Sequence, residues 1–374
     1  MKVFKNFFFS LKNYSNFQKL NNLENSIIFY VENKRDWDHL GSLYIELKNK
    51  YKEGIYRVTS DLEDNFLKDR DTFFIGSGSM RTIFFKTLNA KALILTLPDL
   101  ENLYLKRSNS NTKYFYIFHS LFSSHRIYNE KAFDHYDFIL CAGNYHLHEL
   151  RKREIIFKLK QKKLLPFGYP KLDSLIKNDK AKNNFSEKKI LIAPSWGESS
   201  IIKSSIINII DQLLKNSNQV ILRLHTMSYL YDKKIIKEIK SKFIHDKNFA
   251  IDEELNSLKS YEESFTMISD WSGAAIEFAF SKCCPVIFID TLPKTNNTNW
   301  RKLDLPCFED NVRNKIGYIV SEKNLSSINS IIKEIKKHEI KKNWNDQIIK
   351  IREDNIFNVG KACLHGAEMI TKYI

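Results

Sequence analysis

Two successive series of short apolar runs, alternating with longer amphipathic segments, most constrain what this chain can fold into. In the first series, apolar runs at 26–31 and 55–58 flank a segment, 37–51, whose apolar residues recur at helical spacing. Further apolar runs follow at 72–75, 92–97, 114–119 and 138–141. Strands that alternate with helices in this way predict a parallel sheet covered by helices on both faces.

The second series follows a basic helical stretch at 145–163 and a Pro-Phe-Gly-Tyr-Pro segment at 166–170, which is typical of a link between domains. We expect strands at 189–193, 219–224, 249–251, 265–268, 285–290 and 316–320, with helices at 201–214, 233–243, from 272 and at 326–337. A chain of 374 residues is long enough for two hydrophobic cores.

These patterns predict an α/β protein with two Rossmann-like domains, at 23–168 and 169–345, after an amphipathic N-terminal segment at 1–22. The helices at 346–374 are expected to cross back onto the first domain, by analogy with other proteins built from two such domains.

The sequence also predicts where the protein is found. The densest apolar stretch, 279–292, is interrupted by Lys282 and Pro285, and a membrane span needs about 18 apolar residues. Near the N-terminus the apolar core at 7–10 is too short for a secretory signal. Five cysteines without a paired metal spacing fit buried thiols in a reducing compartment. We therefore predict a cytoplasmic protein.

A formal net charge of +15 favours acidic partners, although lysines on solvated helix faces explain it equally well. No nucleic-acid-binding signature is present, so nucleic acid is not a predicted partner. Residues 3, 4, 7, 8, 11 and 14 place apolar side chains at helical spacing among lysines. This helix either lies on an anionic membrane surface or packs on its own domain. The first interpretation places the protein on the inner face of the cell membrane.

Ligands of open parallel sheets bind beyond the carboxyl ends of the strands, so polar residues that follow apolar runs are site candidates. His119 ends the run at 115–119, and His125 follows shortly after. A histidine has an ordinary pKa that suits a general base near neutral pH. The alternative is a histidine that only binds a neighbouring loop.

Two further candidates open the second domain. Ser195 and Trp196 follow the strand at 189–193 in a Pro-Ser-Trp-Gly turn, whose backbone N–H groups can bind a phosphate oxygen. Arg223 and His225 follow the strand at 219–224 and are candidates for neutralising a diphosphate.

The most informative segment is 267–278, in which Ser269, Asp270 and Ser272 precede a predicted helix. A helix that begins here directs its positive end toward an anion, and Gly273 permits close approach of the backbone. Glu277 lies one turn further on, where a ribose can reach it. An ordinary capped helix explains Asp270 and Ser272 but not the whole segment.

These motifs, in this order, resemble the CDP-glycerol glycerophosphotransferase family, which includes teichoic acid primases and polymerases. The resemblance covers about residues 115–290: the Phe-His-Ser run at His119, the Gly-Tyr-Pro-Lys-Leu-Asp run with Lys171, the turn at 193–196, the Arg-Leu-His run at 223–225 and the segment at 269–278. Polymerases of the family usually have tryptophan and glycine beside the first histidine. Phe118 and Ser120 stand there in this chain, as expected for a variant subgroup.

The resemblance implies a GT-B fold, in which the two domains face each other across a cleft, and attack by an acceptor hydroxyl on the β-phosphorus of CDP-glycerol. His119 and His225 would be the catalytic residues, with His119 as the base. The other matched residues would bind the donor, namely Ser195, Trp196, Arg223, Ser269, Asp270, Ser272, Gly273 and Glu277. His125 and Lys171 would lie toward the acceptor. No cofactor or metal is implied, and a divalent ion would be an auxiliary at most.

The expected function is therefore a transferase that uses a cytidine-nucleotide donor, such as CDP-glycerol, to build a teichoic-acid-like or capsular polymer on a lipid-linked or glycan acceptor. Two alternatives stay open. One is a GT-B glycosyltransferase that uses a CMP-sugar such as Kdo or a nonulosonic acid. The other is a non-catalytic nucleotide-binding scaffold.

Overall fold

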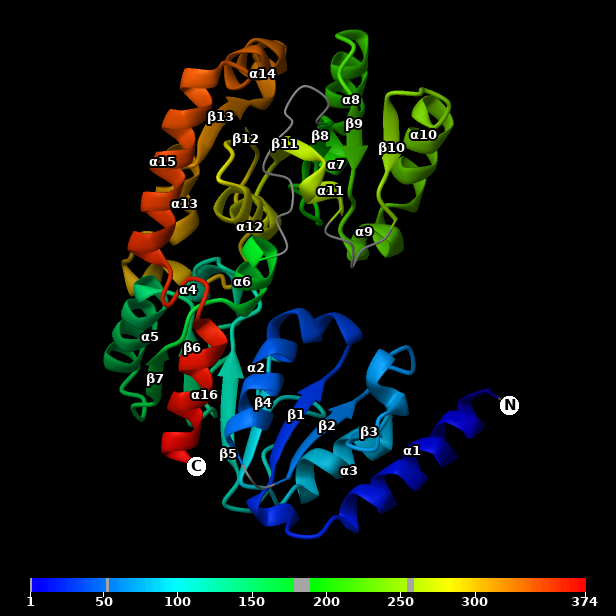
Figure 1. Ribbon diagram of the computed structural model, residues 1–374, viewed down its shortest axis with the longest axis vertical. Helices are drawn as coiled ribbons and strands as arrows, with labels where there is room; N and C mark the ends of the chain where they lie inside the picture. Colours follow the sequence, from blue (N-terminus) through cyan, green and yellow to red (C-terminus); the bar gives the residue numbers. More distant parts are fainter. Residues whose placement is uncertain (1, 52–53, 178–188, 254–258) are drawn as a thin grey trace.

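The computed structural model describes residues 2–51, 54–177, 189–253 and 259–374, and these form two halves, each built around one parallel sheet (Figure 1). The first sheet has the order β3-β2-β1-β4-β5-β6-β7 and the second has the order β10-β9-β8-β11-β12-β13. In each sheet the chain first adds strands on one side of the first strand and then on its other side. The strand order therefore reverses between β1 and β4 in the first sheet and between β8 and β11 in the second. The predicted α/β fold with two Rossmann-like halves is confirmed.

The strands of the first sheet are β1 (Ile27–Val31), β2 (Ile55–Thr59), β3 (Thr72–Phe74), β4 (Ala92–Leu95), β5 (Lys113–Ile117), β6 (Phe138–Cys141) and β7 (Lys163–Pro166). Those of the second are β8 (Lys189–Ile192), β9 (Val220–Leu222), β10 (Phe249–Ile251), β11 (Ser264–Ser269), β12 (Val286–Asp290) and β13 (Gly317–Ser321).

The helices that cover the first sheet or join the halves are α1 (Lys2–Gln18), α2 (Trp37–Lys50), α3 (Ser79–Thr87), α4 (Ser124–Ile127), α5 (Asn144–Ile156) and α6 (Pro170–Lys177). The second half contains α7 (Ile201–Ser204), α8 (Ile206–Lys215), α9 (Thr226–Tyr231), α10 (Lys233–Phe243), α11 (Lys259–Glu262), α12 (Gly273–Lys282), α13 (Phe308–Val312), α14 (Ile328–Ile335), α15 (His338–Asn355) and, returning to the first half, α16 (Ala362–Tyr373).

Each strand consists of consecutive apolar residues because both faces of each sheet are covered. In β1 every residue is buried, and successive side chains enter different cores: Ile28 and Tyr30 pack with α3, while Ile27 and Phe29 pack with α2. This two-sided burial explains why the strands read as unbroken apolar runs in the sequence.

The C-terminal return to the first half is confirmed. Helix α15 runs along the second half, and α16 then packs beside α2 (Figure 1), burying Ala367 and Ile370 against the first sheet. The returning chain crosses the link between the halves at Gly168, which has a φ of +106°. A Cβ at this position would lie 2.4 Å from the carbonyl oxygen of Phe357, so glycine is required both by conformation and by space.

The N-terminal helix α1 packs on its own domain. Phe17 is fully buried, the Tyr14 hydroxyl shares a hydrogen bond of 2.5 Å with Thr87, and Phe9 stacks on Phe74 at 5.3 Å between ring centroids. Some apolar side chains nevertheless stay exposed, among them Phe7 at 43%, Phe8 at 64% and Leu11 at 42%. The side chains of Val3 and Phe4, included in the predicted stripe, lie outside the described residues. Within the described residues, no helix has the length and apolar character to span a membrane.

Several element boundaries differ from the prediction. The basic helix ends at Ile156, and β7, which begins at Lys163, is an edge strand in which only Leu165 is buried. The predicted helix at 201–214 is interrupted at Ser205. Strand β9 ends at Leu222, so the residues that follow it lie in the loop before α9.

Candidate functional site

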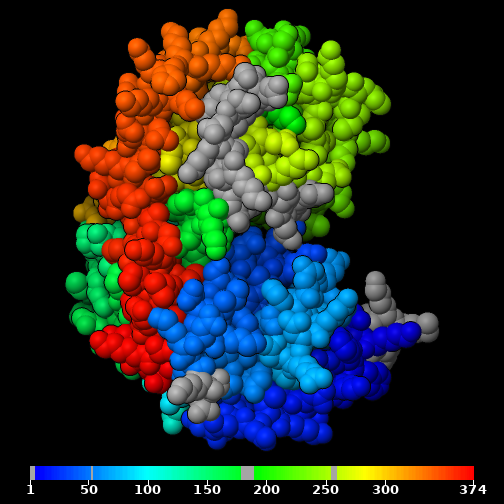
Figure 2. All heavy atoms as spheres, viewed as in Figure 1, coloured from blue at the N-terminus to red at the C-terminus, as the bar shows by residue number. Residues whose placement is uncertain are grey.

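A cavity of about 720 Å³ lies between the two halves, at the place where Figure 2 shows the surface hollowed between the N-terminal half and the second half. The first half lines it with the turn after β1, the start of α2 and His119. Helix α6, the loops after β8 and β9 and the start of α12 form the other walls. The cavity therefore lies between the points at which the strand order of each sheet reverses, and ligands of open parallel sheets bind at such points.

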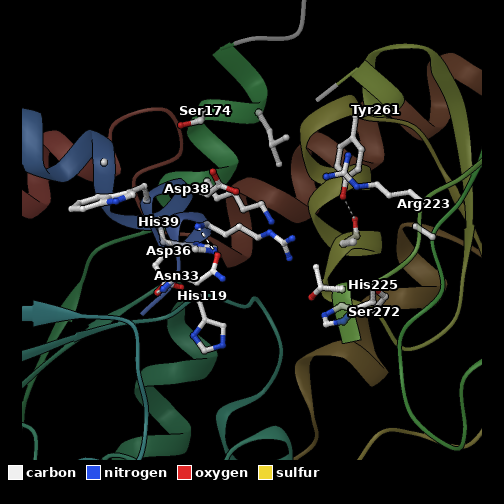
Figure 3. A pocket seen from close by; sticks show the side chains of 18 of the residues that line it. Asn33, Asp36, Asp38, His39, His119, Ser174, Arg223, His225, Tyr261 and Ser272 are labelled. Carbon is white, nitrogen blue, oxygen red and sulfur yellow. Dashed lines mark hydrogen bonds between the residues drawn. The ribbon is translucent and has the colours of Figure 1, made fainter. Parts of the chain in front are cut away.

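His119 lies on the wall supplied by the first half (Figure 3). Its Nδ1 is 3.0 Å from the carbonyl oxygen of Thr96, so Nδ1 carries the proton and Nε2 is left as an acceptor. Desolvation by the surrounding protein lowers the pKa of His119, against the opposing effect of the Thr96 carbonyl. The ring is therefore neutral near pH 7, in the form that can accept a proton.

His225 faces the cavity from the second half (Figure 3). Its Nδ1 accepts a hydrogen bond of 3.1 Å from the backbone N–H of Met227 and so caps α9. Desolvation lowers the pKa of His225 to about 4, with further lowering by Lys294, Arg35 and Lys171. At neutral pH it is thus a neutral donor through Nε2, whereas the sequence suggested a cation.

Arg223 lies beside His225 in the same loop and lines the cavity. Its Nη1 is 3.2 Å from a carboxylate oxygen of Asp252 and 2.9 Å from the hydroxyl of Ser260. The guanidinium also lies 5.5 Å from the ring centre of Tyr261. These contacts hold the cation against one wall, ready to bind an anionic oxygen.

The start of α12 faces the cavity through Ser272 (Figure 3). A Cβ added to Gly273 would lie 3.3 Å from the hydroxyl of Ser120, so the helix start approaches the residue next to His119 closely. The N–H groups at the first turn of a ten-residue helix favour an anion.

Ser269 and Asp270 are buried behind this wall and do not line the cavity. The Ser269 hydroxyl donates to the carbonyl oxygen of Ala193 at 2.5 Å. The Asp270 carboxylate accepts from the backbone N–H groups of Ser195, at 2.7 Å, and Ile201, at 2.9 Å. Both residues therefore hold the loop after β8 in place, and direct contact with a donor, as we predicted for them, is not what the geometry favours.

The loop after β8 itself reaches the cavity through Ala193 and Pro194. Ser195 is buried, and Trp196 stacks beside His225 with 5.8 Å between ring centroids. Lys294 lies 3.8 Å from the centre of the Trp196 ring. Trp196 is thus a neighbour of the site that supports the His225 ring, and it does not form a wall of the cavity.

Glu277 is 4% exposed and is engaged by two side chains. The Tyr169 hydroxyl donates to it at 2.6 Å, and Lys171 Nζ lies 2.8 Å from its other carboxylate oxygen. Lys171 lines the cavity, whereas Glu277 does not. The predicted contact of Glu277 with a ribose stays a prediction.

His125 does not line this cavity, and its predicted place on the acceptor side stays a prediction. It is 4% exposed, its Nδ1 is 3.3 Å from Glu149 Oε1, and its Nε2 is 3.4 Å from the Cys307 sulfur. Only six positions separate it from His119, but the chain turns into α4 between them. There His125 lies between Glu149 of α5 and Cys307, the residue before α13.

The sequence did not indicate the turn after β1 as part of the site. This turn and the start of α2 supply Asn33, Arg35, Trp37, Asp38 and His39. The His39 ring lies 6.2 Å from that of His119 and 5.4 Å from that of Tyr169. The rule that ligands bind beyond strand ends, applied to the run at 26–31, would have indicated this turn.

Among the residues that the structure describes, no cluster of three or more histidine, cysteine, aspartate or glutamate side chains is arranged to bind a metal ion.

Comparison with known proteins decides the family. The model of the family described as CDP-glycerol:poly(glycerophosphate) glycerophosphotransferase matches residues 14–292. The chain belongs to this glycerophosphotransferase family. No curated protein sequence matches the chain.

Solved structures similar to this glycerophosphotransferase family member share its fold. The wall teichoic acid polymerase TagF, in a histidine-to-asparagine variant soaked with CDPG, has a TM-score of 0.61 at 16% identity, covering 97% of this chain and 93% of that one. A UDP-N-acetylglucosamine 2-epimerase of Methanocaldococcus jannaschii has a TM-score of 0.60 at 14% identity, with 93% and 99% covered. A 2-epimerase assigned to the same reaction in Listeria monocytogenes has a TM-score of 0.61 at 11% identity, with 93% and 96% covered. Together with the family, this fold makes the chain a transferase of the GT-B type.

Proposed function

We propose that this protein transfers a glycerol phosphate group from a cytidine diphosphate donor to a hydroxyl of a growing cell-surface polymer. Membership of the glycerophosphotransferase family supports the donor. The observation that carries the mechanism is the position of His119: a neutral imidazole on one wall of the cavity, opposite Arg223, His225 and the start of α12 on the other.

The reaction follows from this arrangement. The acceptor oxygen forms a bond to the β-phosphorus, and the bond from that phosphorus to the oxygen bridging the two phosphates breaks. CMP leaves with that oxygen, and the acceptor proton passes to Nε2 of His119. Phosphoryl transfer of this kind depends on positioning and on stabilising the charge of the phosphate oxygens. Arg223, the Nε2–H of His225 and the N–H groups of α12 can supply that charge stabilisation.

The acceptor is proposed to be a lipid-linked or glycan chain at the inner face of the membrane. The exposed Phe7, Phe8 and Leu11 of α1, together with a net charge of +15, support a peripheral association with an anionic surface. No metal or cofactor is part of the proposal, and we expect turnover to persist in the presence of EDTA.

A thermal-shift panel at matched concentrations tests the donor. It contains CMP, CDP, CTP, CDP-glycerol, CDP-ribitol, CMP-Kdo, UDP and GDP. Stabilisation confined to the cytidine compounds, and strongest with the CDP-polyols, is the expected result. Stabilisation by CMP-Kdo alone would favour a true glycosyltransferase. A response only to UDP or GDP would refute the cytidine donor, and ligand binding without CMP release in a turnover assay would favour a scaffold.

A further inference from the structure

Arg35 extends from the first half toward a cavity whose other cations come from the second half. It lies in a short 3₁₀ turn, η2 (Lys34–Asp36), that directly follows β1, and it lines the same cavity as Arg223 and His225. Among the described residues its guanidinium forms no hydrogen bond or ion pair, and its Nε is buried without a partner. A desolvated guanidinium N–H without an acceptor is unfavourable, and this points to an anionic ligand.

The turn that carries Arg35 is held rigidly. The Asn33 side chain accepts from the backbone N–H of Arg35 at 3.0 Å. The Asp36 carboxylate accepts from the N–H groups of Glu32, at 2.9 Å, and Asn33, at 3.1 Å. The N–H of Lys34 donates to Asp61 at 2.9 Å. All of these hydrogen bonds fix the backbone of the turn, and none involves the guanidinium. The N–H groups of the Arg35 side chain therefore stay available to a ligand.

Arg35 shares the cavity with Arg223 of the second half. The positive charge of Arg35 contributes to the lowered pKa of His225, and that of Arg223 contributes, after desolvation, to the lowered pKa of Arg35. Asp38 and Asp61 act in the opposite direction on the pKa of Arg35, and the effect of Asp38 is larger than that of Arg223. Other acids close to the cavity are already engaged, Glu277 by Lys171 and Asp252 by Arg223. A ligand with two or more negative charges could bind Arg35 and Arg223 at the same time.

We propose that Arg35 binds the transferred β-phosphate of the donor from the side of the first half, so that the diphosphate is held by both halves at once. This inference rests on the proposed function. Arg223, His225 and the start of α12 belong to the second half, while His119 and Arg35 belong to the first. The phosphate that meets the acceptor oxygen must lie near His119. On that side, the side-chain N–H groups of Arg35 have no acceptor among the residues that the structure describes.

The test compares Arg35→Gln with the wild-type protein in calorimetric titrations of CMP and CDP. A charged hydrogen bond to the second phosphate predicts that CDP binds about tenfold or more weakly to the variant, while CMP binds within about twofold of wild type. Lys34→Gln is the matched control, because Lys34 is the neighbouring cation on the same turn, its Nζ pairs with Glu63 at 2.8 Å, and it does not line the cavity. It should bind both nucleotides as wild type does.

Arg35→Lys keeps the charge but loses the planar fork, so it should recover part of the lost affinity for CDP. Equal losses for CMP and CDP, or no loss for either, would overturn the assignment of Arg35 to the β-phosphate. The same titrations with UMP and UDP separate this inference from the proposed function. If the wild-type protein binds UDP more tightly than CDP, the cytidine donor is refuted. The role of Arg35 is then tested by the loss of affinity of Arg35→Gln for UDP compared with UMP. If wild type binds neither pair, both proposals fail.

Discussion

Nδ1 of His119 lies 3.0 Å from the carbonyl oxygen of Thr96, and this contact assigns the proton of the ring to Nδ1 and leaves Nε2 as the acceptor. The carbonyl is supplied by the residue just after β4, and the histidine by the segment just after β5, so two neighbouring strand ends orient the imidazole. The position of Nε2 is therefore fixed before any acceptor arrives.

If Nε2 of His119 is the base, His119→Ala should lower kcat by about a hundredfold or more, with little change in donor affinity. Steady-state kinetics of CMP release, with the donor Kd measured separately, checks this. His365→Ala is a suitable control, because His365 is a partly exposed histidine on α16 that does not line the cavity. A His119→Ala enzyme with near-normal kcat would place the base elsewhere.

The lowered pKa of His119 predicts the pH dependence of the reaction. The base form is neutral, and a lowered pKa keeps it neutral to more acidic pH than a free imidazole, whose pKa is about 6.5. The acidic limb of kcat/KM against pH should therefore have its inflection below 6.5, and activity should level off above it. An inflection at or above 6.5 would contradict the desolvated position of the ring.

His225 should make stability depend on pH. Its pKa is about 4 in the folded protein, whereas an unfolded histidine takes up a proton near pH 6.5. Between these values the unfolded chain binds more protons, so the free energy of unfolding falls as the pH decreases from about 6.5 toward 4. His225→Gln should flatten this part of the curve of melting temperature against pH. An unchanged slope would mean that His225 is not neutral in the folded protein.

The Asp270 carboxylate is buried and accepts two backbone N–H groups of the segment after β8, so its role is structural support of the site. Asp270→Ala leaves those N–H groups without acceptors and should reduce the free energy of unfolding by about 1–3 kcal/mol, together with weaker donor binding. Chemical denaturation checks this against Asp354→Ala, an exposed aspartate on α15. Weaker donor binding at unchanged stability would instead indicate direct contact between Asp270 and the donor.

A substitution at Gly168 tests whether the C-terminal chain crosses closely over the link between the halves. Gly168→Ala requires an alanine at a φ of +106° and places a Cβ 2.4 Å from the Phe357 carbonyl oxygen, so we expect strong destabilisation, more than about 3 kcal/mol. Gly78→Ala is the control, since nothing lies within 4 Å of a Cβ there and its φ is negative. Equal melting temperatures for the two variants would contradict the close crossing.

Much of the fold could be predicted because both sheets are buried on two sides, which produces continuous apolar runs. Strand β7 was missed because only Leu165 of its four residues is buried, and an edge strand next to solvent carries little apolar signal. Its final residue, Pro166, is also tolerated at an edge.

The site could be predicted only in part, because strand ends can be read from a sequence but burial cannot. His119, Arg223, His225 and Ser272 follow strands and do line the cavity. Asp270 also follows a strand, yet packing against a loop 75 residues earlier buries it, and no local pattern encodes that contact.

The turn with Arg35 was missed for a related reason. The order of the strands shows that β1 lies at the reversal of the first sheet, and that order depends on pairing between strands far apart in sequence, such as β1 with β4.

The most direct test of the proposed function is the reaction itself. Purified wild-type protein and His119→Ala are incubated with CDP-glycerol and a lipid-linked acceptor, and CMP release is measured together with the mass of the product. We expect one CMP for each glycerol phosphate added by the wild-type protein, and a rate at least about a hundredfold lower for the variant. A product without added glycerol phosphate, or equal rates for the two proteins, would contradict the proposal.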